Sequence, residues 1–255
     1  MNLLAIETAT ESCSVAVYNG TALISRSEIA PRRHGELLLP MCEDVLAEAG
    51  ISRRQLDAIA VGRGPGAFTG VRLAISAAQG LALALDIPVI PVSSLEALAL
   101  DAAMSDGTNV DRSNGKPPST GNAILAVIDA RMGEIYAGTF CRRAAEFGTD
   151  SVGALLRIEP LGPETVGPAA QLELPRASSW SVIGSGWATY KDEILRHLPQ
   201  SPRWADGARY PQASAIARLS WPTLLAGRGQ APELALPVYL RDKVALTLDE
   251  QRARN

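Results

Sequence analysis

Residues 3–18 read LLAIETATESCSVAVY, and this stretch decides how the chain begins to fold. An apolar run (LLAI) leads into a polar segment (ETATES), and the following CSVAVY alternates as a half-buried strand does. Asn19-Gly20 is a strong hairpin signal, and residues 21–29 again have an extended pattern. The chain is therefore predicted to open with three consecutive antiparallel strands.

A second copy of this arrangement follows about 122 residues later. Residues 123–128 form an apolar run, 129–134 a polar turn, and 135–141 alternate as a returning strand. Each turn starts with an acidic residue, Glu7 in the first copy and Asp129 in the second. The pattern predicts a duplicated α/β unit rather than a short-period repeat.

Helical and extended patterns alternate along the rest of the chain. Strands are predicted at residues 58–61, 88–92 and 180–183, helices at 34–49, 71–85, 93–104, 190–197 and 214–227, and extended chain at 237–241. Pro40 and Pro222 lie inside two of these helices and are expected to kink or interrupt them. Gly50 is a suitable residue to end the first helix, and residues 248–255 are expected to be a frayed tail.

The domain organisation follows from one polar segment. Residues 105–122 contain almost no apolar side chains, which is typical of a linker or surface loop. The chain is therefore divided into an N-terminal lobe at 1–104, a linker at 105–122 and a C-terminal lobe at 123–255, whose last segment can pack back on the first lobe. A length of 255 residues suits two modest domains.

Charge and hydropathy exclude several classes of protein. Lys and Arg number 24 against 27 Asp and Glu, so the chain lacks the positive excess typical of autonomous nucleic-acid binding. The sequence enters a strand pattern at Leu3 without a basic leader, and no apolar run approaches the roughly 18 residues of a membrane span. We expect a cytoplasmic protein with no membrane association.

Few residues could carry catalysis or hold a metal. His34 and His197 are the only histidines, and the sequence has neither an H-E-x-x-H pair nor a G-x-S-x-G elbow. Cys13, Cys42 and Cys141 are widely spaced, so neither a disulfide framework nor a cysteine zinc site is expected. The sequence therefore predicts no catalytic residue and no metal site.

Two segments could hold a phosphate group. GRGPGAFTGVR at residues 62–72 joins a strand to a helix and lacks the Lys-Ser/Thr pair of a Walker A loop, so it is either an anion cradle or a tight βα turn. The first polar turn offers the Glu7 carboxylate and the hydroxyls of Thr8, Thr10 and Ser12 to a hydrated cation and a phosphate. The alternative is that both polar turns belong to ordinary hairpins.

Together these motifs resemble known proteins. Residues 6–16 are similar to the first-hairpin motif of the actin-like (ASKHA) ATPase superfamily. GRGPGAFTGVR at 62–72, AQGLA at 78–82, IDARMGEIY at 128–136 and PVYLR at 237–241 resemble, in this order, the TsaB (YeaZ-like) family of bacterial tRNA threonylcarbamoyladenosine biosynthesis. The resemblance covers about residues 2–241 and is weaker in 105–122 and 142–178.

The resemblance implies an α/β fold of two actin-like (ribonuclease H-like) lobes, each a mixed β-sheet flanked by helices. It implies a noncatalytic scaffold that binds and activates TsaD, the paralogue that transfers threonylcarbamoyl to the adenosine next to the anticodon, together with the P-loop ATPase TsaE. The chain would be no enzyme by itself but an essential subunit of the tRNA N6-adenosine threonylcarbamoyltransferase complex. It would form a homodimer in isolation and meet tRNA only through the complex.

The same resemblance implies where the sites lie. The partner surface is built from the two helices of the first lobe, and the residues assigned to it are His34, Leu37, Leu38, Met41, Val45, Arg72, Ile75, Ala78, Gln79 and Ala82. Candidate nucleotide-binding residues are Glu7, Thr8, Thr10, Ser12, Gly184 and Gly186. No cofactor is expected to bind strongly to this chain alone, and ATP or ADP is expected only at the complex interface.

Two other functions are weighed against the scaffold. An autonomous ATPase or small-molecule kinase of the same superfamily would need a working acid in the first turn, where this chain has Glu7 and the superfamily usually has Asp. A metalloprotease would need paired histidines, and the two here stand 163 positions apart. If the scaffold reading holds, Ala78→Arg is expected to break the partner contact and leave each lobe folded.

Overall fold

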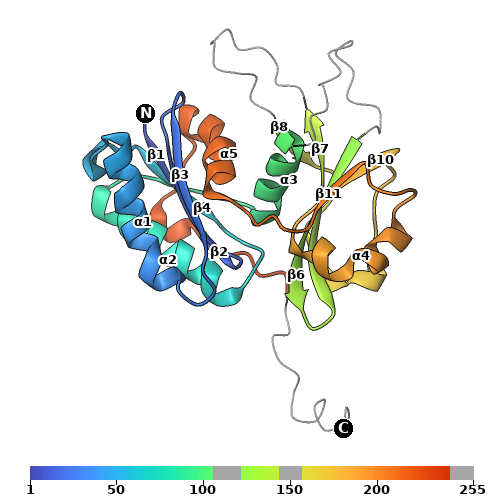
Figure 1. The fold of residues 1–255 in the computed structure, drawn as a ribbon. Helices are drawn as coiled ribbons and strands as arrows, with labels where there is room; N and C mark the ends of the chain where they lie inside the picture. The colour runs from blue at the N-terminus through green and yellow to red at the C-terminus, as the bar shows by residue number, and fades with distance from the viewer. Residues whose placement is uncertain (106–121, 144–156, 242–255) are drawn as a thin grey trace.

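The first of two β-sheets carries the opening strands (Figure 1). The computed structural model describes residues 1–105, 122–143 and 157–241. Its first sheet consists of β1 (Leu3–Glu7), β2 (Ser12–Tyr18), β3 (Leu23–Ile29), β4 (Ala58–Gly62) and β5 (Val89–Val92), in the order β3-β2-β1-β4-β5. The first three strands are antiparallel, and β4 and β5 continue the sheet in parallel with β1. The predicted opening hairpins are confirmed.

The second sheet repeats this topology. It consists of β6 (Asn122–Arg131), β7 (Glu134–Arg143), β8 (Arg157–Pro160), β10 (Ser179–Ile183) and β11 (Trp204–Asp206), in the order β11-β10-β6-β7-β8, and β9 (Thr165–Pro168) pairs with β7. Again three antiparallel strands are followed by two parallel ones. The duplicated α/β unit and the two-lobed α/β fold class are thus confirmed.

Helices cover both faces of both sheets. α1 (His34–Ala49) and α2 (Phe68–Leu85) pack on the outer face of the first sheet, and α4 (Ser185–His197) packs on the outer face of the second. α3 (Ser94–Ser105) and α5 (Ala213–Leu225) lie between the two sheets (Figure 1). Single 3-10 turns are η1 (Arg53–Gln55), η2 (Ala169–Gln171) and η3 (Pro232–Leu234).

The two central helices cross between the lobes. α3 follows the first sheet in the sequence but packs on strands of the second, whereas α5 follows the second sheet and packs on the first. On the first sheet the side chains that face α5 are small, as at Ala5, Ala16 and Ala60, while Ile6 and Val61 face α1 and α2. This exchange places both helices in one core shared by the lobes, so the lobes are joined by packing as well as by the chain.

Several local features differ from the sequence predictions. α1 and α5 run without a break through Pro40 and Pro222, so the expected interruptions are wrong; helix packing on the sheet offsets the one backbone hydrogen bond that each proline removes. α2 begins at Phe68, three residues earlier than predicted. Residues 248–255, and all but the ends of the predicted linker at 105–122, lie outside the described residues.

Candidate partner surface and interlobe cleft

The Glu7 carboxylate lies at the end of β1 and is completely buried. It accepts hydrogen bonds from the Ala9 backbone N–H (2.6 Å) and from Ser94 Oγ (2.7 Å). Gly62 faces it so closely that a Cβ there would lie 2.0 Å from Glu7 Oε2. Burial raises the pKa of Glu7 above its ordinary value of 4.5. Glu7 therefore packs closely against Gly62 of β4 and is hydrogen-bonded to the start of α3, and its carboxylate is not exposed to solvent.

The glycine-rich segment after β4 packs against the first polar turn. The Ala67 N–H donates to the Ala9 carbonyl (2.7 Å), and a Cβ at Gly66 would lie 2.3 Å from that carbonyl oxygen. Thr8 Oγ1 likewise donates to the Gly70 carbonyl (2.7 Å). These contacts are those of a tight βα turn, and the glycines permit its close approach to the hairpin.

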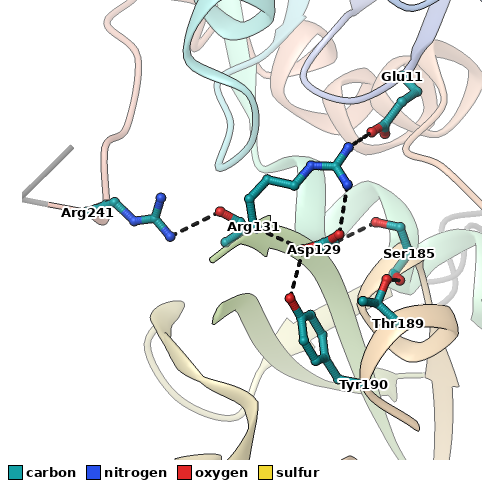
Figure 2. A network of polar contacts seen from close by, with 8 residues as sticks. Glu11, Asp129, Arg131, Ser185, Thr189, Tyr190 and Arg241 are labelled. Carbon is teal, nitrogen blue, oxygen red and sulfur yellow. Dashed lines mark hydrogen bonds and ion pairs between the residues drawn. The ribbon is translucent and has the colours of Figure 1, made fainter. Parts of the chain in front are cut away.

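An arginine links the two hairpin turns across the cleft (Figure 2). Arg131 Nη2 pairs with Glu11 Oε1 of the first lobe, and Nη1 pairs with Asp129 Oδ2 (3.0 Å) of the second. Tyr190 donates its hydroxyl to Asp129 Oδ1 (3.3 Å). Burial and the Asp129 charge raise the pKa of Tyr190, so this hydroxyl stays protonated. The place between the two turns is therefore occupied by a guanidinium group.

A cleft of about 310 Å³ lies beside this bridge, between the lobes. It is lined by the first turn, the segment before α1, the loop before α2, the second turn and the segment 238–241. At its edge Arg72 Nε donates to the Tyr239 hydroxyl (2.6 Å), and its guanidinium lies 3.7 Å from the centre of the Phe68 ring. Both rings are about half exposed. Sequence reasoning did not identify Arg131 or this aromatic cluster as a site.

The six candidate nucleotide residues do not gather at one site. Thr10 lines the cleft, whereas Thr8 and Ser12 are completely buried. Ser12 Oγ is within hydrogen-bond distance of Ser27 Oγ (3.0 Å). Gly184 and Gly186 pack against Val127 beneath the second turn.

The predicted partner residues on α1 and α2 divide into two sets. His34, Leu37, Arg72 and Gln79 are partly or fully exposed. Six others are buried in the core beneath the helices: Leu38, Met41, Val45, Ile75, Ala78 and Ala82. Assignment of these six to a partner surface is wrong for the folded chain, because their side chains face the sheet of their own lobe.

The outward face of α2 is a different stripe of the same helix. Its exposed or half-exposed members are Thr69, Leu73, Ser76, Ala77, Gly80, Leu83 and Ala84, which we call the α2 outer face. No charged residue occurs from Leu73 to Leu85, and Leu83 is 74% exposed. By length and composition alone α2 could cross a membrane, with a mean hydropathy of 1.4, but in this fold its inner face packs on the first sheet. Its outer face is an uncharged, mostly small-residue surface, of which only Leu73 and Ala77 pack partly on the core of their own lobe among the residues that the structure describes.

Among the described residues, little supports metal binding or thiol chemistry. No group of three or more His, Cys, Asp or Glu side chains is placed to hold a metal ion within residues 1–105, 122–143 and 157–241. Burial raises the thiol pKa of Cys13 to about 11 and that of Cys42 to about 12, so both remain neutral thiols. Both behave as small core residues.

Two sheets of one topology around a central helix pair, with a cleft between the lobes, define a two-lobed actin-like protein of the ASKHA class. Comparison with known proteins refines this class. The family model of TsaD, tRNA N6-adenosine threonylcarbamoyltransferase, matches residues 21–247. YeaZ from Pseudomonas aeruginosa, a solved structure, is 38% identical with a TM-score of 0.76, over 94% of this chain and 99% of that one.

Curated relatives give the particular family. The chain is 36% identical to the tRNA threonylcarbamoyladenosine biosynthesis protein TsaB of Escherichia coli K12, over 96% of both chains. It is 34% identical to the TsaB protein of Haemophilus influenzae, over 96% of this chain and 95% of that one. The chain belongs to the TsaB family.

Proposed function

We propose that this chain acts in tRNA threonylcarbamoyladenosine biosynthesis as a noncatalytic subunit that binds and activates a TsaD-like paralogue. The biosynthetic role is the one that the relatives' names carry. The observation that supports the partner role is the α2 outer face, an exposed helix surface with no charge over thirteen residues, from Leu73 to Leu85. Small side chains let a second helix approach closely, so the face suits a helix–helix contact.

The first turn supports a noncatalytic role. An actin-like ATPase needs its first-turn carboxylate in the cleft, whereas Glu7 is completely buried and bonded to Ser94 and Ala9. Arg131 spans the space between the two turns.

The same α2 outer face serves two assemblies in this proposal. The chain alone forms a homodimer through it and exchanges the homodimer for a heterodimer with TsaD. TsaE then joins the complex, through which tRNA is met in the cytoplasm.

Gly80→Arg tests this proposal. Gly80 is exposed and a Cβ added there meets nothing within 4 Å, so we expect the variant to fold as the wild type does. In a close helix–helix contact the arginine is overpacked and desolvated, and we expect at least a 100-fold loss of affinity for TsaD, roughly 3 kcal/mol. Light scattering on a sizing column, with the chain alone and mixed with its cognate TsaD, measures both the dimer and the complex.

Gly167→Arg is the matched control. Gly167 lies on β9 of the other lobe, and a Cβ there also meets nothing within 4 Å. This variant should bind TsaD as the wild type does. A Gly80→Arg chain that binds with unchanged affinity would refute the α2 outer face as the interface. A wild-type chain that does not bind TsaD at all would refute the partner role itself.

A further inference from the structure

The second polar turn, between β6 and β7, has a strained backbone. Arg131 and Met132 both lie in the left-handed region, with φ of 65° and 58°, which residues with a side chain seldom adopt. Such a conformation is costly and persists only where the surrounding contacts fix it. Asp129 supplies these contacts: its Oδ1 accepts a hydrogen bond from the Arg131 backbone N–H (2.8 Å), and its Oδ2 pairs with the Arg131 guanidinium (3.0 Å). The turn therefore directs the guanidinium toward the first lobe (Figure 2).

Asp129 is itself held by the second lobe. Its backbone N–H donates to Ser185 Oγ (3.1 Å) at the start of α4, and Tyr190 of the same helix donates its hydroxyl to Asp129 Oδ1 (3.3 Å). Only 10% of the Asp129 side chain is exposed, against 69% of the Arg131 side chain. The acidic residue of this turn is thus part of a fixed support from which an arginine reaches across the cleft.

Two arginines join the second turn to the first lobe. Arg131 Nη2 pairs with Glu11 Oε1 in the first polar turn. Arg241 Nη2 donates to the Ala130 carbonyl (3.0 Å) and pairs with Glu134, at the end of the second turn. Both arginines line the interlobe cleft. The second turn is therefore held at two points beside the cleft.

Arg241 acts from the first lobe because its segment is attached there. The Gln230 backbone pairs with Val89 of β5, and the Val238 N–H donates to the Arg63 carbonyl (2.9 Å) after β4. Three residues further along the chain, Arg241 contacts the second lobe. The segment thus crosses from one lobe to the other at the cleft.

The lobes meet a second time at the apolar core around α3 and α5. Beside it, Glu164 of the second lobe pairs with Arg63 (3.8 Å) and accepts a hydrogen bond from Ser93 Oγ, directly before α3. These contacts include neither Arg131 nor Arg241. The core can therefore act as a pivot while the contacts at the cleft form and break.

We propose that Arg131 and Arg241, with their partners Glu11 and Glu134, form an interlobe latch. The latch holds the lobes together at the cleft without any ligand, and its release lets them turn about the core around α3 and α5 into a more open arrangement. Ion pairs that are partly exposed are weak and are screened by salt, so the two arrangements differ little in free energy and exchange. The latch stands independently of the proposed partner role, because it uses the two turns and not the α2 outer face.

Pulsed electron–electron double resonance on the full chain measures the distance between the lobes. Spin labels at Asp44→Cys on α1 and Asp192→Cys on α4 report it, because both positions are exposed and these helices lie on the outer faces of the two sheets. Cys13 and Cys42 are buried, and Cys141→Ser removes the half-buried third thiol. Excess unlabelled chain is added, so that the measured distances lie within one chain.

Glu11→Gln combined with Arg241→Met removes one charge from each ion pair of the latch and keeps most of the side-chain volume. At low salt we expect the open arrangement to be populated about three to ten times more in this double variant than in the labelled chain without it. Sodium chloride at about 1 M should produce the same change in the chain with an intact latch, because the Debye length there falls to about 3 Å. The double variant should then respond little to salt.

Glu28→Gln is the matched control. It breaks the exposed ion pair between Arg33 and Glu28 (3.0 Å), which lies within the first lobe, and should leave the distance distribution and its salt response unchanged. The proposal is overturned if the double variant keeps the distribution of the intact chain at low salt, since the core alone then sets the position of the lobes. It is equally overturned if salt opens the double variant as much as the intact chain.

Discussion

The Ala78→Arg chain is expected to lose about 3–5 kcal/mol or more of its free energy of unfolding, enough to unfold the first lobe at moderate temperature. Ala78 is completely buried between α2 and the first sheet, among residues such as Ile6 and Val61. The arginine would overpack this core and leave a guanidinium there without a partner. The sequence-based expectation that this variant stays folded and only loses its partner is therefore reversed.

Ala84→Arg is the matched control for this prediction. It places the same substitution on the same helix, but on the exposed α2 outer face. Its free energy of unfolding should stay within about 0.5 kcal/mol of the wild type. Urea unfolding followed by circular dichroism measures both variants. Equal urea midpoints for Ala78→Arg and the wild type would show that position 78 does not face the core.

The strand framework could be predicted because its signals are local. The apolar run before Glu7, the alternation after it and the turn at Asn19-Gly20 each act over a few residues, and the register of β1 and β2 follows from them. The same signals recur before and after Asp129. The duplicated topology therefore follows from hairpins that the sequence specifies twice.

The orientation of α2 could not be predicted in the same way. Both of its faces are apolar: Ala74, Ala78 and Ala82 repeat at helical spacing, and so do Leu73, Gly80 and Leu83. Hydrophobic periodicity finds the inner face of a helix only when the other face is polar. Packing on the sheet decides that the first set is buried, whereas Gly80 and Leu83 are exposed and Leu73 is half-buried.

Contacts between distant segments could not be predicted from the sequence either. Arg131 reaches Glu11 across 120 positions, and Tyr239 reaches Arg72 across 167. No local pattern identifies such partners, because an isolated arginine or tyrosine is equally compatible with an exposed position. The crossing of α3 and α5 between the lobes has the same origin, since it depends on contacts between each helix and the sheet of the other lobe.

The difference in unfolding free energy between Glu7→Gln and the wild type is expected to grow in favour of the variant as the pH rises from about 4.5. Burial raises the pKa of Glu7 in the folded chain above the ordinary 4.5, so the folded state retains a proton that the unfolded state releases. The stability that Glu7 contributes is thus fully present below pH 4.5 and is lost as the pH rises through the folded pKa. Glutamine cannot ionise, and it can still accept from the Ala9 N–H and donate to Ser94 Oγ.

Glu7→Ala separates ionisation from hydrogen bonding. It also removes the titrating group, so its difference from the wild type should have the same slope with pH as that of Glu7→Gln. It should be less stable than Glu7→Gln by about 2–4 kcal/mol at every pH, because the Ala9 N–H and the Ser94 hydroxyl lose their partner and a cavity remains. Urea unfolding of the three chains between about pH 4 and 8 measures slope and offset separately. A difference that stays flat, or that falls as the pH rises, would mean that Glu7 is held in its ionised form and that its contacts outweigh its burial.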